Sequence, residues 1–202
     1  MEQIKNTEND MAEYKKGKKA GKIFQLEIWL EDIKPRIWRS LAVRPFMKLD
    51  RMHMVIQKAM GWTNSHLHQF ISSEGIYYSY PYPGYDRYDD GTEDETFVKI
   101  SDLIAAPGDR LKYQYDFGDC WNHIIELKSI ETAKPGAKYP VCLAGERACP
   151  PEDCGGPWGY ADMLDILAGQ DSDQKQEYEE WLGAKFDPEA FNIEKINRRI
   201  KR

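Results

Sequence analysis

The chain has 202 residues, of which 31% are charged, and its formal net charge at pH 7 is -6. This length allows one domain with a substantial core. The negative charge disfavours nucleic acid as a partner, and no apolar run approaches the length of a membrane-spanning helix. The chain has four cysteines and does not begin with an apolar run, so a reducing, cytoplasmic location is expected.

Residues 1–21 combine acidic residues with a cluster of lysines and contain almost no large apolar side chains. This composition predicts a disordered leader, although the lysines could also contact nucleic acid or anionic lipid. Residues 22–202 are expected to form a single α+β domain. We divide it into a sheet part (22–142), a Cys-Pro-Pro loop (143–158) and a helical part (159–202).

The spacing of apolar residues predicts an α+β fold with a mixed or antiparallel sheet of about five to seven strands. Apolar and polar residues alternate over 24–30, as in a half-buried strand. Over 49–60 the apolar residues recur at helical spacing, and Gly61 is expected to end that helix. A C-terminal cluster of helices is predicted, with apolar stripes that end at Gly169 and Gly183.

A β-hairpin is predicted around residues 113–124. The dipeptide Gly118-Asp119 fits a two-residue loop. This register pairs Phe117 with Cys120, Asp116 with Trp121, and Gln114 with His123. One face then carries Asp116, Trp121 and His123, and the opposite face carries Tyr113, Tyr115, Phe117 and Ile124.

That register would place the carboxylate of Asp116 beside the imidazole of His123. The carboxylate of Asp116 would favour the charged ring of His123 and raise its pKa. A general acid or base needs such a group. The alternative, which we favour, is an Asp–His hydrogen bond that ties two strands together.

The loop from Cys149 to Gly156 reads Cys-Pro-Pro-Glu-Asp-Cys-Gly-Gly. The prolines fix φ and the glycines permit positive φ, so the loop should hold its side chains in a preset geometry. Zinc or iron bound by Cys149, Cys154 and His123 is one hypothesis, although the spacing differs from Cys-x2-Cys pairs. Free buried thiols are the alternative, and a disulfide is less expected in a reducing compartment.

Two further segments suggest contacts. If 67–71 is a strand, His66 and His68 share one face, and two such histidines can bind one metal. The alternative is a pair of half-exposed cross-strand contacts.

Residues 76–88 are rich in tyrosine and residues 86–95 are acidic, so we expect a solvated loop with a tyrosine surface for a partner.

Several short sequence segments together resemble those of a known protein family. They include Leu49, Met52 and His53; Ala59–Trp62 and His66–Phe70; Tyr115–Asp119, Trp121 and His123; Gly145, Glu146 and Cys149–Gly156; Gly159 and Tyr160; Trp181–Gly183 and Phe186–Glu189. In these strings the chain resembles the Ri-plasmid (pRiA4b) open-reading-frame-three-like family, whose members also occur as passenger proteins of a bacterial insertion element. The resemblance implies an α+β fold and an association with plasmids or mobile elements, and it implies no established activity. Cys120 departs from the family pattern, which more often has an acidic residue there.

Three functions from different classes remain. The favoured one is a binding or accessory module whose acidic and aromatic pocket receives a small molecule, a peptide, a protein or a cation. The predicted lining is Asp116, Asp119, Trp121, His123, Glu146, Glu152 and Asp153. The second is a hydrolase that uses a divalent metal to activate water. It would use His66, His68, His123 and nearby carboxylates. Over all the metal hypotheses together, the candidate ligands are His66, His68, His123, Cys149 and Cys154. The third is a nucleic-acid accessory factor of mobile elements.

Overall fold

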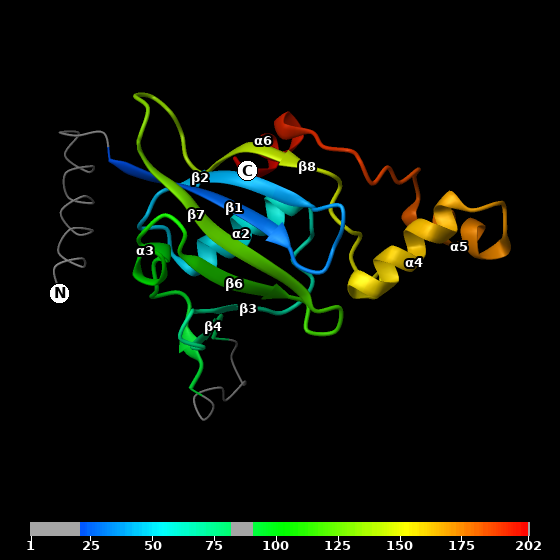
Figure 1. Ribbon diagram of the computed structural model, residues 1–202, viewed down its shortest axis with the longest axis horizontal. Helices are drawn as coiled ribbons and strands as arrows, with labels where there is room; N and C mark the ends of the chain where they lie inside the picture. The colour runs from blue at the N-terminus through cyan, green and yellow to red at the C-terminus, as the bar shows by residue number, and fades with distance from the viewer. Residues whose placement is uncertain (1–20, 82–90, 202) are drawn as a thin grey trace.

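The computed structural model describes residues 21–81 and 91–201, and its centre is a single eight-stranded sheet (Figure 1). The strands are β1 (Lys22–Leu30), β2 (Trp38–Val43), β3 (His68–Ile71), β4 (Tyr77–Ser79), β5 (Glu93–Asp94), β6 (Arg110–Tyr115), β7 (Trp121–Thr132) and β8 (Val141–Glu146). Their order across the sheet is β5-β4-β3-β6-β7-β1-β2-β8. The β4–β5 pair is parallel and the other pairs are antiparallel. The predicted α+β fold with a mixed sheet is confirmed, with slightly more strands than expected.

Five helices accompany the sheet in the described part of the chain. They are α2 (Leu49–Met60), α3 (Ile100–Leu103), α4 (Gly156–Ala168), α5 (Asp173–Leu182) and α6 (Ile193–Ile200). The predicted helix over 49–60 is confirmed, and Gly61 ends it with a φ of 113° that favours glycine. Gly169 and Gly183 follow the ends of α4 and α5, as their apolar stripes predict.

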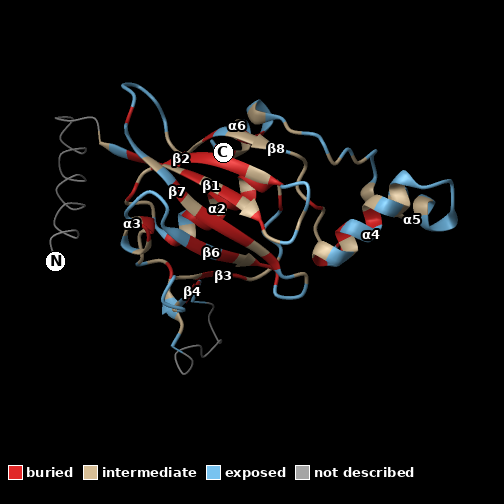
Figure 2. Cartoon of the chain, viewed as in Figure 1, coloured by how far each residue is buried: buried red, intermediate tan, exposed pale blue. Residues whose placement is uncertain are grey.

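The core lies between the central strands and α2. Strands β1, β2, β6 and β7 carry many of the buried residues in Figure 2, and α2 crosses behind them in Figure 1. Met52 and Ile56, one turn apart on α2, are fully buried. Helix α6 contacts α2 and β8, whereas α5 has no buried residue and extends with α4 away from the sheet.

The β6–β7 hairpin differs from the sequence-based register. Tyr115 lies opposite Trp121, and Tyr113 lies opposite His123. The predicted pairing of Asp116 with Trp121 is therefore wrong, and the connection contains the five residues 116–120 rather than two. As direct partners, Trp121 and His123 share a sheet face with the two tyrosines, and that face is the core.

The wider loop has a local cause in the side chain of Asp116. Its Oδ1 atom accepts hydrogen bonds from the backbone N–H groups of Gly118 at 2.9 Å and Asp119 at 3.3 Å. The backbone of Asp116 has a φ of 57°, a conformation that aspartate tolerates better than most residues. This aspartate-capped turn competes with the two-residue turn that Gly118-Asp119 alone suggests.

Some of the segments predicted from the sequence lie wholly or partly outside the residues that the structure describes. The predicted leader, residues 1–21, lies outside them except for Gly21, and so does much of the acidic stretch 86–95. The proposed subdivision of residues 22–202 stays a prediction. Within the described ranges, no helix combines the length and the apolar character needed to cross a membrane.

Candidate functional site

His66 lies between the hairpin loop and the Cys-Pro-Pro loop. Its Nδ1 atom is 3.6 Å from Oδ2 of Asp116, and its Nε2 atom is 3.0 Å from Oδ1 of Asp153. The side chain is 27% exposed, but Nε2 is shielded from solvent and makes no hydrogen bond of acceptable geometry with a described residue. An imidazole nitrogen beside a carboxylate, without a hydrogen bond of its own, can offer its lone pair to a cation.

Asp116 is held in place by the turn it caps. Because its Oδ1 atom binds the loop backbone, its Oδ2 atom is left to face His66. Its own backbone N–H donates to the carbonyl of Leu67 at 2.8 Å, which fixes the loop against the start of β3. The residue is only 7% exposed, so its carboxylate is presented from a rigid position.

Glu152 joins the Cys-Pro-Pro loop to the segment after α2. Its carboxylate accepts hydrogen bonds from Tyr115 Oη at 3.0 Å, from the backbone N–H of Thr63 at 2.8 Å and from the Thr63 hydroxyl at 3.0 Å. Tyr115 Oη also accepts from the N–H of Ser65 at 3.0 Å. Burial, followed by the Glu152 carboxylate, raises the pKa of Tyr115, so its hydroxyl stays protonated and donates.

The two loops contact each other directly. The backbone N–H of Gly155 donates to Oδ2 of Asp119 at 3.1 Å. Gly156 lies so close to the Asp119 carbonyl that a Cβ atom there would overlap it. Trp62 donates from Nε1 to the carbonyl of Pro150 at 3.0 Å, which ties the same loop to the end of α2. The groups around His66 therefore belong to one hydrogen-bonded unit.

This arrangement brings three metal-binding side chains together. The donor atoms of His66, Asp116 and Asp153 all lie within 4.8 Å of one another, and we call these three residues the cation site. Metal bonds of about 2.1 Å place donor atoms at most about 4.2 Å apart, so small side-chain movements would close the set around an ion. One imidazole and two carboxylates suit zinc, manganese or ferrous iron.

The residues predicted to line a pocket separate into two groups. Asp116, Glu152 and Asp153 meet around His66 at the junction of the two loops, and Asp119 joins those loops through Gly155. The other three lie elsewhere: Trp121 and His123 are fully buried in the core, and Glu146 is an exposed residue at the end of β8. The corrected hairpin register explains the separation, because it turns Trp121 and His123 away from Asp116.

The predicted metal ligands also separate. His68 and His66 do not share a strand face, because β3 begins only at His68. Five metal ligands were predicted, and within the described ranges His66 is the only one of them that belongs to a cluster of three metal-binding groups. The predicted ligands outside that cluster are His68, His123, Cys149 and Cys154. All four cysteines are free, and burial raises the pKa of Cys149 and brings that of Cys154 to about 12. Both therefore remain neutral thiols at physiological pH.

A second polar cluster fills the core beneath Trp62. His68 Nε2 contacts both carboxylate oxygens of Glu95, at 3.1 and 3.0 Å, and His53 Nδ1 lies 2.8 Å from Tyr113 Oη. Glu95 is fully buried, so the expectation that it belongs to a solvated loop is wrong. The acidic sequence around it gave no sign of this, because its partner is 27 residues away in the chain.

Sequence reasoning missed Thr63 and Tyr115 as parts of the site. Tyr115 was placed on the apolar face of the hairpin, where its ring does lie, yet its hydroxyl reaches Glu152. The available signal for Thr63 was the run of short polar residues, Thr63, Asn64 and Ser65, directly after the helix-ending Gly61. Such residues often bind backbone or nearby side chains at helix ends.

Comparison with known proteins places this site within a family. The model of the plasmid pRiA4b ORF-3-like protein family matches residues 22–195. The chain belongs to this family. It is 34% identical over 180 residues to the uncharacterized protein y4hQ of Sinorhizobium fredii (strain NBRC 101917 / NGR234), which covers 88% of this chain and 90% of that protein.

This pRiA4b ORF-3-like protein is also similar in fold to a protein whose crystal structure has been solved. The crystal structure of MM3350 from Methanosarcina mazei Go1, a protein of unknown function, matches with a TM-score of 0.76 and 33% identity. The match covers 86% of this chain and 96% of that chain.

Proposed function

We propose that this pRiA4b ORF-3-like protein is a binding module that holds a divalent transition-metal cation between the hairpin loop and the Cys-Pro-Pro loop. The observation that supports the proposal is the convergence of His66, Asp116 and Asp153, whose donor atoms lie within 4.8 Å of one another. The three residues come from segments separated by about 50 and 37 residues, so only the folded chain brings them together.

The surroundings favour binding over a purely structural ion pair. Asp153 is 67% exposed, so an ion can reach the site from solvent. Asp116 is fixed by its turn, and Glu152, 3.9 Å from His66 Nε2, adds a further negative charge nearby. Three carboxylates around one imidazole would repel each other without a cation, and a bound ion would relieve that repulsion.

The test is calorimetric titration of the metal-free protein with Mn²⁺ and, separately, with Zn²⁺. Manganese is the decisive probe because it favours oxygen and imidazole ligands over the thiols elsewhere in the chain. We expect one Mn²⁺ per chain, and at least about tenfold weaker binding for His66→Gln and for Asp153→Asn. Asp162→Asn, which removes an exposed carboxylate on α4, is the matched control and should bind as the unmodified chain does.

Failure of Mn²⁺ and Zn²⁺ to bind, or equal affinity in His66→Gln and Asp162→Asn, would refute the cation site. Elemental analysis of the purified protein gives an independent check, because an ion that copurifies should be lost in His66→Gln.

A hydrolytic function is the second candidate, and one observation favours it. Three protein ligands leave coordination positions open, as in catalytic metal sites that activate water. Of the three histidines proposed for this chemistry, His66 alone lies at the site, since His68 and His123 are buried in the core. Turnover of p-nitrophenyl phosphate or p-nitrophenyl acetate by the Mn²⁺-loaded protein, lost in His66→Gln, would support the enzyme over the binding module.

A further inference from the structure

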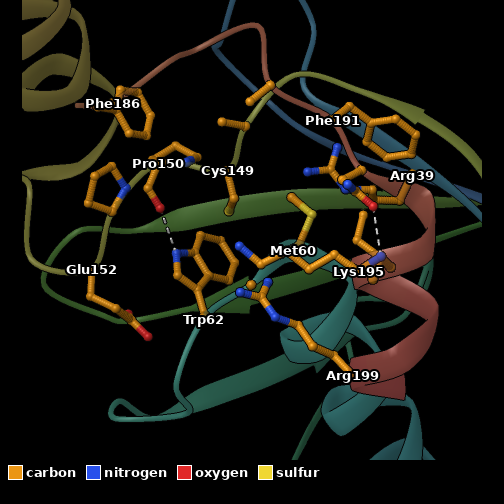
Figure 3. Close-up of a pocket in the computed structure, with 16 residues that line it drawn as sticks. Arg39, Met60, Trp62, Cys149, Pro150, Glu152, Phe186, Phe191, Lys195 and Arg199 are labelled. Carbon is orange, nitrogen blue, oxygen red and sulfur yellow. Dashed lines mark hydrogen bonds between the residues drawn. The ribbon is translucent and has the colours of Figure 1, made fainter. Parts of the chain in front are cut away.

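A pocket of about 570 Å³ lies next to the Cys-Pro-Pro loop, and the sequence gave no indication of it (Figure 3). Its walls come from four parts of the chain: Arg39 in β2, the end of α2 with Trp62, residues 148–152, and residues 186–199. Its volume falls in the range of sites that enclose small molecules. Glu152 is a wall of this pocket and also a neighbour of the cation site, so the two features share one loop.

Two cations from α6 line the pocket. Lys195 and Arg199 are four residues apart and so lie on the same side of the helix, and both side chains extend toward Trp62 in Figure 3. Within residues 21–81 and 91–201, neither cationic group has an ion pair or a side-chain hydrogen bond. Arg198, their neighbour on α6, instead lies 3.9 Å from Glu194 and points to solvent.

A third cation adds positive charge without being available to a ligand. Arg39 is 2% exposed and donates to four backbone carbonyls, those of Trp38, Ala59, Glu146 and Arg147. Carbonyls neutralise no charge, so the guanidinium leaves a positive potential in the wall of the pocket.

The acidic residue of the pocket does not neutralise these cations. The carboxylate of Glu152 accepts hydrogen bonds from Thr63 and Tyr115, and in Figure 3 it lies on the opposite side of Trp62 from Lys195 and Arg199. The pocket therefore has an excess of positive charge although the whole chain carries a net charge of -6.

The rest of the lining is apolar and aromatic. Trp62, Phe186 and Phe191 offer ring surfaces, and Met60 and Cys149 lie between them (Figure 3). Burial raises the pKa of Cys149, so its thiol is neutral and adds no negative charge. A positive region beside aromatic walls matches a ligand with an anionic group and a flat apolar body.

We propose that this pocket binds a small organic oxyanion. Its carboxylate or phosphate group pairs with Lys195 and Arg199, and its planar part packs against Trp62, Phe186 and Phe191. Inorganic phosphate lacks the planar part and an uncharged nucleoside lacks the oxyanion, so each should bind far more weakly than a molecule that has both. This inference does not depend on the cation site, because none of the three residues of that site lines the pocket.

The test is calorimetric titration with adenosine monophosphate and with indole-3-acetate, each in the presence of EDTA so that cation binding makes no contribution. Adenosine and inorganic phosphate are the half-ligand controls. We expect at least one of the two full probes to bind at least tenfold more tightly than either control.

The variants Lys195→Gln and Lys195→Gln/Arg199→Gln should weaken that binding, the double variant by at least tenfold. Arg198→Gln removes an equal charge from the same helix outside the pocket and should leave the affinity unchanged. Lys195 is exposed, so its substitution should not impair folding. The proposal is overturned if neither full probe binds more tightly than its controls, or if Lys195→Gln/Arg199→Gln and Arg198→Gln bind equally well.

Discussion

The imidazole rings of His53 and His68 stack in parallel within the core, with their centroids 3.4 Å apart and an angle of 4° between their planes. Both side chains are almost fully buried. Burial, with the neighbouring His68 as the second cause, lowers the pKa of His53 to about 3. Burial likewise lowers the pKa of His123 to about 4. His53 and His123 are therefore neutral at physiological pH.

Acid should destabilise this core before most carboxylates are protonated. The unfolded chain binds protons at His53 and His123 below about pH 6.5, whereas the folded chain leaves His53 neutral until about pH 3 and His123 neutral until about pH 4. Stability therefore rises with pH across this window and falls as pH drops through it. Each histidine should remove roughly 1.4 kcal/mol of unfolding free energy per pH unit well below pH 6.5.

Urea unfolding at pH 7.5, 6.5, 5.5 and 4.5 measures this dependence. The variant His123→Phe removes one of the two titrating groups, so its stability should fall less steeply with decreasing pH. A flat profile between pH 6.5 and 5 in the unmodified chain would contradict the buried-neutral assignment of these histidines.

The hydroxyl of Tyr115 should matter for the cation site as well as for stability. Tyr115→Phe removes the hydrogen bonds to Glu152 and Ser65 and should cost about 1 to 3 kcal/mol. Because Glu152 is then held only by Thr63, the Cys-Pro-Pro loop should loosen and Mn²⁺ affinity should fall.

Tyr113→Phe is the matched comparison. The Tyr113 hydroxyl accepts from Gln57 and contacts His53 in the core, away from the two loops. We expect a similar loss of unfolding free energy and no change in Mn²⁺ affinity. If both variants bound Mn²⁺ equally, the Tyr115–Glu152 contact would have no role in positioning the site.

Gly156 should be far less tolerant of substitution than another glycine of the same backbone conformation. Gly156 and Gly136 have φ values of 69° and 72°, but a Cβ at Gly156 would overlap the Asp119 carbonyl, whereas Gly136 faces open space. Gly136→Ala should cost about 1 kcal/mol from the left-handed backbone alone. Gly156→Ala should cost about 3 kcal/mol or more because the two loops must also separate. Chemical unfolding of both variants measures the difference, and equal losses would exclude the steric contribution.

One cysteine should react in the folded chain. Cys120 is exposed in the hairpin loop, while Cys142 and Cys154 are buried and burial raises the pKa of both, as it does for Cys149. Iodoacetamide at pH 7.5 should therefore label one thiol in the native protein and four in denaturant. Mass spectrometry counts the adducts, and Cys120→Ser should abolish native labelling. Rapid native labelling of Cys149 would show that the loop opens readily.

Local pattern was enough to determine the α+β class of this protein and several of its helices and strands. The helix over 49–60, its end at Gly61 and the strand over 24–30 follow from periodicity and from the backbone freedom of glycine, which depend on neighbours in sequence. The presence of a hairpin between β6 and β7 was also predictable from composition, although the length of its loop was not.

Only the tertiary structure decided which of these residues meet. One side-chain turn at Asp116 lengthened the hairpin loop and sent Trp121 and His123 into the core, because a change of strand register moves side chains between faces. The grouping of His66 with Asp116 and Asp153, the burial of Glu95 against His68, and the presence of Lys195 and Trp62 in the lining of one pocket all join distant segments. Such contacts depend on how the sheet, the helices and the loops pack, and residue spacing along the chain carries no information about distances across that packing.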